Sequence, residues 1–147
     1  MADQYLAHAL ESSVDVMERA TRAAREMGHP HVDTEHLLFA LCDRPGPAAF
    51  ILGQAGVTAS AVRAHAIGVG PLANAPGQPQ PTPRVRNILW RSYAARTLTG
   101  DPRVGTEHML VALLEDEHGC AAAALRACGA EPADVHRRLL RTLSSAA

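Results

Sequence analysis

The chain has 147 residues and a formal net charge of −1, and 47% of its residues are hydrophobic although only 3% are aromatic. This length suits one domain that buries roughly two thirds of its unfolded surface, and the near-neutral charge argues against nucleic acid or an anionic membrane as a partner. Few aromatic residues and alanine runs such as 121–124 favour an all-α fold.

The first predicted helix opens near Ser12, or a turn earlier, and runs to Met27. Gly28 suits a C-terminal cap, and Pro30 prevents the helix from continuing through the following loop, residues 29–33. Three- and four-residue steps predict one buried apolar stripe, made of Leu10, Val14, Met17, Thr21 and Ala24.

A nearly all-apolar helix is predicted from Glu35 to Cys42, with Thr34 as its N-cap. Such a helix belongs at the centre of a bundle. Shorter helices follow at 48–54 and from Thr58, the latter carrying Val62, Ala66 and Ile67. Residues 68–81, rich in Pro and Gly, predict an exposed linker.

The second half of the chain predicts four more helices. Thr82 followed by Pro83 is a favoured helix start, and it opens a helix that runs to Leu98. The other three are expected at about 107–115, 119–127 and 132–143.

The eight residues from Thr34 to Leu41 return in similar form from Thr106 to Leu113, so that Glu35 and Glu107 lie 72 residues apart. Residues 52–56 match 125–129 at a spacing of 73. A match of this density indicates a duplication. We therefore predict a single all-α domain over residues 1–147, with eight helices arranged as two four-helix repeats, 6–67 and 82–143, related by a pseudo-twofold axis.

Metal binding and catalysis find little support in the pattern. The possible metal ligands near the first Thr-Glu-His do not share one face of a helix, and the second copy keeps only the Glu and the His; they are His29, His31, Asp33, Glu35 and His36. We predict no metal and no cofactor. The three cysteines, Cys42, Cys120 and Cys128, form no CxxC and are expected to be buried and inert, so we predict no enzyme.

Several arginines crowd one part of the second half without interleaved aromatic residues, which indicates a solvated face rather than a nucleic-acid platform; they are Arg84, Arg86, Arg91, Arg96 and Arg103. No apolar run reaches the 18 or so residues of a membrane span, and the N-terminus lacks a leader pattern. We expect a cytoplasmic protein.

The duplicated Thr-Glu-His is the remaining candidate site. Thr34 and Thr106 are expected to cap their helices, and His36 and His108 to be bonded at the helix start. The helix dipole stabilises a carboxylate in the first helical turn by about 0.3–1 kcal/mol. The residues alone leave open whether Glu35 and Glu107 support capping or accept a cationic ligand.

These motifs resemble the Clp N-terminal repeat domain of ClpC- and ClpA-type AAA+ unfoldases. The resemblance rests on Gly-His-x-x-Val-x-Thr-Glu-His-Leu-Leu from Gly28, on Thr-Pro-Arg from Thr82 and on Val-Gly-Thr-Glu-His-Met-Leu from Val104, and it covers about residues 6–143. It implies a docking platform that receives substrates and adaptor proteins for a Clp unfoldase.

ClpC-type members of this family bind phosphoarginine through a Thr and the Glu of Thr-Glu-His. The resemblance therefore implies a ligand of this type for the present chain. In this chain the second such pocket maps onto Thr82 and Glu107. Glu35 stands at the matching place in the first half, where Leu10 replaces the Thr. Pro81 replaces an aromatic residue at the rim of the second pocket.

The sequence shows no Walker motif, so we expect a free-standing accessory or decoy domain of Clp proteolysis that binds Clp substrates, adaptors or the unfoldase. One alternative is an N-terminal docking domain excised from a full ClpC-type ATPase. Another is a protein that sequesters small molecules, such as cyclic-peptide antibiotics directed at Clp.

Overall fold

The computed structural model describes the backbone of residues 2–69 and 77–146 and the side chains of residues 12–68 and 77–145. This part of the chain forms the eight predicted helices, one 3-10 turn and two very short strands. The elements are α1 (Ala2–Glu26), β1 (His31–Val32), α2 (Thr34–Asp43), α3 (Pro47–Gln54), α4 (Ala59–Val69), β2 (Gln80–Pro81), α5 (Pro83–Ala95), η1 (Arg96–Leu98), α6 (Thr106–Leu114), α7 (Cys120–Ala127) and α8 (Pro132–Ala146).

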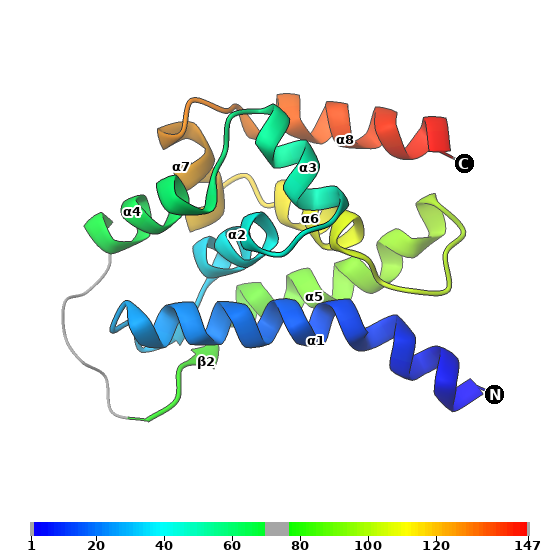
Figure 1. Cartoon of the computed structure of the whole chain (residues 1–147), viewed down its shortest axis with the longest axis horizontal. Coiled ribbons are helices and arrows are strands. Elements are labelled where there is room, and N and C mark those ends of the chain that lie inside the picture. The colour runs from blue at the N-terminus through cyan, green and yellow to red at the C-terminus, as the bar shows by residue number, and fades with distance from the viewer. Residues whose placement is uncertain (1, 70–76, 147) are drawn as a thin grey trace.

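The helices form layers around a central pair (Figure 1). Helices α1 and α5 lie side by side on one face, α2 and α6 occupy the middle, and α3, α4, α7 and α8 cover the other side. Gly28 and Gly100, which follow the first helix of each repeat, both have a positive φ, 73° and 70°. Glycine enters this region at little cost, which confirms Gly28 as the predicted end of the first helix.

Three boundaries differ from the prediction. Helix α5 ends at Ala95 rather than at Leu98, because the 3-10 turn η1 follows it. Helix α1 begins at Ala2, about ten residues before Ser12, because residues 2–11 continue the helix without a breaker. The predicted linker 68–81 is shorter, since α4 runs to Val69 and Gln80 pairs in parallel with His31. Residues 70–76 of that linker lie outside the described residues. None of the described helices is both long and apolar enough to cross a membrane.

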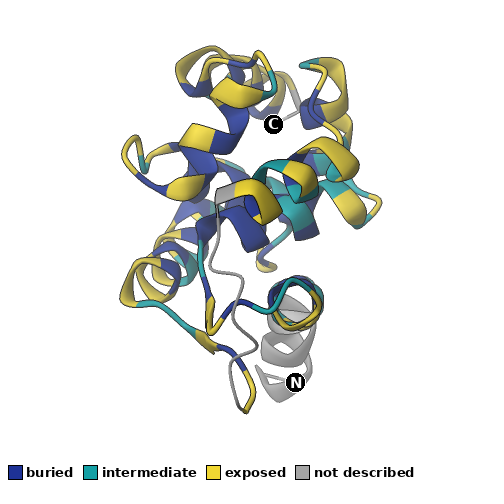
Figure 2. Cartoon of the chain, turned by 90° about the vertical axis from the view of Figure 1, so that its left-hand side faces the viewer, coloured by how far each residue is buried: buried dark blue, intermediate teal, exposed yellow. Residues whose placement is uncertain are grey.

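Helices α2 and α6 are buried almost completely, as their apolar sequences predict. Leu38 and Leu110, equivalent residues of the two repeats, are both 0% exposed. Figure 2 shows the buried residues gathered in the interior of the helix assembly and the exposed ones around it. The two central helices therefore form a shared core, so that neither repeat buries its apolar surface alone.

The two threonines of the duplicated motif join the repeats. Thr34 Oγ1 accepts a hydrogen bond from the backbone N–H of Ala121 in α7 (2.9 Å), and Thr106 Oγ1 accepts one from Ala48 in α3 (3.2 Å). Each hydroxyl thus satisfies a free amide at the start of a helix in the opposite repeat. The predicted role of Thr34 and Thr106 as caps of their own helices is wrong, because Asp33 and Gly105 hold the N-cap positions.

Two glycines leave space for these hydrogen bonds between the repeats. A Cβ added to Gly46 would lie 3.1 Å from Thr106 Oγ1, and one added to Gly119 would lie 3.0 Å from Thr34 Oγ1. Both distances are tighter than ordinary van der Waals contact. The small residues that begin α3 and α7 therefore let the hydroxyls of the other repeat approach.

We expect Thr34→Val to lower the free energy of unfolding by about 1–3 kcal/mol, because it leaves the buried Ala121 N–H without an acceptor while keeping the side-chain shape. Thr34→Ser keeps the hydroxyl and is the matched control. Urea unfolding followed by circular dichroism measures both. A valine variant as stable as the serine variant would show that the bond contributes nothing.

Candidate functional site

A groove of about 600 Å³ lies between α1 and α5. Its α1 wall carries Val14, Met17 and Thr21, and its α5 wall carries Leu89 and Tyr93. These α5 residues lie beside the ones that the helix buries in the core, such as Val85 and Ile88. Each of the two helices thus presents one apolar stripe to the core and a second one to the groove.

The predicted core stripe of the first helix is wrong in part for this reason. Val14 is 52% exposed, and Met17 and Thr21 are half-buried, whereas Val16 and Ala20 are 0% exposed. Of the predicted stripe, Ala24 alone is among the described core residues, and the side chain of Leu10 lies outside the described residues. The helix is turned so that most of the predicted stripe faces the groove.

Charged side chains border the apolar floor of the groove. Glu18, Arg22 and Arg25 line it from α1, and Gln78 lines it from the segment before β2. Two arginines against one glutamate leave this rim net positive. A groove with an apolar floor and a charged rim suits a peptide with apolar anchors and an acidic residue.

A second feature is an acidic corner where α2 meets α5 and α7. Thr82 caps α5, accepting a hydrogen bond from the Val85 N–H (3.2 Å), and its hydroxyl lies 3.4 Å from Asp33 Oδ1. Glu35, in the first turn of α2, is buried and its Oε2 has no hydrogen-bond partner among the described residues. Burial raises the pKa of Glu35 above its usual value.

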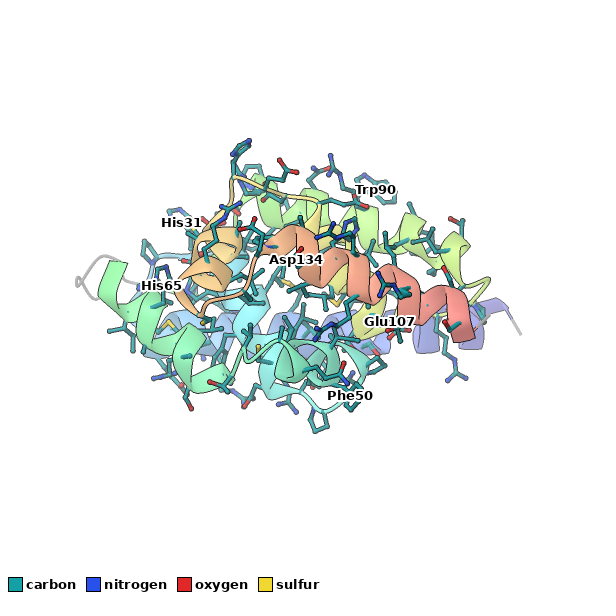
Figure 3. The ribbon with its side chains drawn as sticks, turned by 90° about the horizontal axis from the view of Figure 1, so that it is seen from above. His31, Phe50, His65, Trp90, Glu107 and Asp134 are labelled. Carbon is teal, nitrogen blue, oxygen red and sulfur yellow. The ribbon has the colours of Figure 1, made fainter. Side chains whose placement is uncertain are left out.

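Glu107 lies elsewhere. Thr82 precedes the first residue of α5, whereas His108, next to Glu107, contacts Thr99 just beyond the η1 turn that follows α5 (2.9 Å). A 13-residue helix is about 20 Å long, so Thr82 and Glu107 lie near its opposite ends. Figure 3 likewise shows His31, beside the acidic corner, and Glu107 on different sides of the molecule. The predicted pairing of Thr82 with Glu107 is wrong, and Thr82 instead shares a corner with Glu35.

The Glu107 corner carries a different set of charged side chains. The Glu107 side chain is 17% exposed and its carboxylate folds over Gly105, where an added Cβ would collide with it. Gly105 stands where the first repeat has Asp33. The second corner takes its second carboxylate from Asp101 instead, whose side chain is 51% exposed and lies close to Glu107 and His108.

Both histidines of the motif are bonded at their helix starts, as predicted. His36 Nδ1 accepts the Asp33 N–H (2.9 Å), and His108 Nδ1 accepts the Gly105 N–H (2.8 Å). In a neutral ring the proton therefore sits on Nε2, and His36 Nε2 donates it to His29 Nδ1 (2.8 Å). Burial lowers the pKa of His36 to about 4 and also lowers the pKa of His108.

This tautomer excludes two of the three clusters of possible metal ligands in the described part of the chain. The clusters are His29 with Glu35 and His36; Asp101 with Glu107 and His108; and Asp33 with Glu35 and Cys120. A histidine that binds metal through Nε2 needs its proton on Nδ1, facing an acceptor. In the first two clusters a backbone N–H faces Nδ1 instead. The third contains no histidine and stays possible.

Cys120 corrects another prediction. It is exposed rather than buried, whereas Cys42 and Cys128 are half-buried. Cys120 begins α7, so its position depends on the packing of the two repeats. Partial burial, together with Glu35 and Asp33, raises the pKa of Cys120 to about 11, and burial raises that of Cys42 to about 12. Both therefore stay thiols at neutral pH and are poor nucleophiles.

The arginine-rich surface of α5 is partly neutralised. Arg84 pairs with Asp116 (2.7 Å) and Arg91 lies 3.8 Å from Glu115, which fits the predicted solvated face. Trp90 is 75% exposed on the same helix (Figure 3) and was not singled out by the sequence analysis.

Comparison with known proteins places these features in a family. A family model described as the Clp repeat (R) N-terminal domain matches residues 11–117 and 99–147. The chain is 31% identical over 141 residues to the chloroplastic chaperone protein ClpC of Pisum sativum, covering 93% of this chain and 15% of that protein. It is 32% identical over 135 residues to the chloroplastic ClpA homolog of Brassica napus, covering 89% of this chain and 15% of that protein. The chain thus spans about 15% of the length of these relatives.

Solved structures share the fold. The N-terminal domain of ClpD from Arabidopsis thaliana matches with a TM-score of 0.76 and 19% identity, covering 93% of this chain and 95% of that one. A ClpV N-domain in complex with a VipB peptide matches with a TM-score of 0.69 and 18% identity, covering 97% and 91%. At these identities the matches establish the architecture of the double repeat alone.

Proposed function

The chain belongs to the Clp repeat (R) N-terminal domain family, whose domain is a non-catalytic binding module, and we propose that it docks peptide segments of substrates or adaptor proteins in the groove between α1 and α5. One observation carries this proposal: the two helices hold a second apolar stripe open to solvent. The related ClpV N-domain was solved with a VipB peptide, which supports a peptide as the occupant.

The chemistry of the groove narrows the class of peptide. Val14, Met17 and Leu89 offer a floor for two or three apolar side chains at helical spacing, and Tyr93 adds an aromatic wall. Exposed apolar surface of this kind is typical of an interaction site. Arg22 and Arg25 at the rim favour an acidic residue beside the apolar anchors, so the expected ligand is an amphipathic, acidic segment.

We expect Val14→Glu to weaken peptide binding by about tenfold or more, because it places a charge on the apolar floor. Peptides selected from a random displayed library, measured by fluorescence anisotropy, provide the probe. Ile67→Glu is the matched control, since Ile67 is 43% exposed on α4, away from the groove. Both substitutions affect exposed residues and should change stability by no more than about 0.5 kcal/mol. Equal loss of binding in both variants would contradict the groove as the site.

A second candidate function concerns arginine side chains. A carboxylate recognises a guanidinium through paired charged hydrogen bonds, and both Glu35 and Glu107 remain available for this role. A phosphoryl group on the arginine would be repelled by the half-buried Asp33 beside Glu35 and Thr82, whereas the second carboxylate near Glu107, that of Asp101, is 51% exposed and better screened by solvent. Glu107 is therefore the preferred acceptor for phosphoarginine, and the corner of Glu35 and Thr82 favours an unmodified cation.

Calorimetric titration with free phosphoarginine tests this assignment. We expect Glu107→Gln to abolish the heat of binding while the melting temperature stays within about 2 °C, because the side chain makes no hydrogen bond among those described. Glu35→Gln is the matched variant of the other repeat and should bind nearly as wild type. A reversed pattern would place the site at Glu35 and Thr82.

The wider role follows from the family. The proposed partners are a Clp unfoldase, its substrates and its adaptors, and the groove would also accept a cyclic peptide of similar chemistry. A domain of this kind acts as an accessory or decoy when free, or as the docking domain of a longer unfoldase. Affinity capture with the Val14→Glu variant as the negative control would identify the partners that depend on the groove.

A further inference from the structure

The acidic corner also brings together a thiol and two carboxylates from opposite repeats. Cys120, the first residue of α7, has its Sγ 3.9 Å from Asp33 Oδ2. The sulfur and one oxygen each of Asp33 and Glu35 all lie within 4.8 Å of one another. We propose that this corner binds a zinc ion through Cys120, Glu35 and Asp33, with water as the fourth ligand.

Glu35 brings a buried carboxylate to the cluster, and the donor that faces it is the Cys120 thiol, whose proton a bound metal ion would replace. Glu35 is 8% exposed, and its Oε2 has no hydrogen-bond partner among the described residues. A buried carboxylate needs a cation or hydrogen-bond donors to offset its lost hydration. His36 Nε2 lies 3.9 Å away and donates its proton to His29. Arg84, across the corner, is bound to Asp116.

The donor set suits zinc better than a harder cation. Calcium takes six to eight oxygen ligands, whereas zinc binds thiolate and carboxylate in a four-coordinate sphere. A sulfur about 2.3 Å and an oxygen about 2.1 Å from a tetrahedral zinc lie about 3.6 Å apart. The observed 3.9 Å is close to this separation, so small side-chain movements suffice. Binding would transfer the Cys120 thiol proton to solvent as the Zn–S bond forms.

Asp33 is oriented for this role by contacts that use its other oxygen. Its Oδ1 accepts the Thr34 N–H (2.8 Å) and lies 3.4 Å from the Thr82 hydroxyl. Oδ2 is the oxygen that faces Cys120. Hydrogen bonds of this kind to a ligating carboxylate fix its direction toward the metal.

The second repeat supplies an internal comparison. At the equivalent positions Gly105 replaces Asp33 and Pro47 replaces Cys120, while Glu107 alone is kept. Two of the three proposed zinc ligands, Asp33 and Cys120, therefore have no equivalent at the other corner. Because Glu35 is shared with the acceptor role considered above, zinc would exclude a cationic side chain from this corner and leave Glu107 unaffected.

Titration of the full chain with zinc chloride, in a thiol-free reductant, tests the proposal. We expect one ion per chain, and we expect Cys120→Ser and Glu35→Gln each to lower the affinity by about tenfold or more. Cys128→Ser and Glu107→Gln are the matched controls and should bind as wild type. Circular dichroism melting of each variant distinguishes a lost ligand from a lost fold.

Cobalt substitution gives a second readout. The cobalt-loaded chain should show a thiolate-to-metal charge-transfer absorption that disappears in Cys120→Ser and persists in Cys128→Ser. Absence of zinc binding to the wild type, or equal binding by a folded Cys120→Ser, would overturn the proposal. Peptide binding in the groove does not depend on Cys120, so failure of the zinc site leaves the proposed function intact, and the converse also holds.

Discussion

Replacing Leu110 by alanine should lower the free energy of unfolding by about 2–5 kcal/mol, since it leaves a cavity in the middle of α6. Leu110 is fully buried, and α6 packs against helices of both repeats, including α2, α3, α5 and α8. The surrounding side chains cannot collapse into the space without moving several helices. Urea unfolding monitored by circular dichroism measures the loss.

The design of this test uses the duplication. Leu38→Ala removes the equivalent side chain of the first repeat and should cost a similar amount, whereas Leu98→Ala, at a residue that is 51% exposed, should stay within about 0.5 kcal/mol. A small effect of Leu110→Ala, or two separate unfolding transitions, would contradict a single core shared by both repeats.

Acid should destabilise the fold between pH 6.5 and about 4, because His36 and His108 are held neutral in the folded state. Their pKa values are lowered by burial, that of His36 to about 4 from an ordinary value of 6.5. In this window the unfolded chain binds more protons than the folded one, so stability falls as the pH falls. His36 alone should cost about 2 kcal/mol by pH 5, at about 1.4 kcal/mol per pH unit.

Glutamine variants test whether these two histidines cause the loss of stability in acid. Gln at the third helical position can accept the same backbone N–H but does not titrate, so His36→Gln and His108→Gln should each flatten the acid limb of the stability profile. Exposed His118→Gln is the control and should leave it unchanged. Glu35 acts in the opposite sense, since its raised pKa favours the folded state as it protonates at lower pH. An unchanged acid limb in both buried variants would show that these imidazoles are not responsible.

The helices and the duplication could be predicted from the sequence because both depend on patterns of neighbouring residues. Each of these signals lies within a short stretch of the sequence. They are the three- and four-residue spacing of apolar residues, the glycine at position 28 after a helix, and the repeated Thr-Glu-His. What the sequence could not predict is which side chain meets the other repeat. Thr34 fits an N-cap on local grounds, and its bond to Ala121, 87 residues away, has no local signature.

The candidate site shows the same limit. Val14 and Met17 have the spacing of a core stripe, and only the packing of α1 against α5 shows that they line a groove. The family resemblance paired Thr82 with Glu107 inside one repeat, yet helix α5 separates them by its whole length. Two parallel apolar stripes on the first helix, one through Val16 and Ala20, were the signal that could have indicated the groove.

Nuclear magnetic resonance mapping of a selected peptide onto the isotope-labelled chain tests the docking groove most directly. The amide signals of residues along the groove, including Val14, Met17, Leu89 and Tyr93, should shift in a saturable way, while those of α4 and α8 stay in place. Shifts centred on α3, α4, α7 or α8, with the α1–α5 groove unaffected, would contradict it.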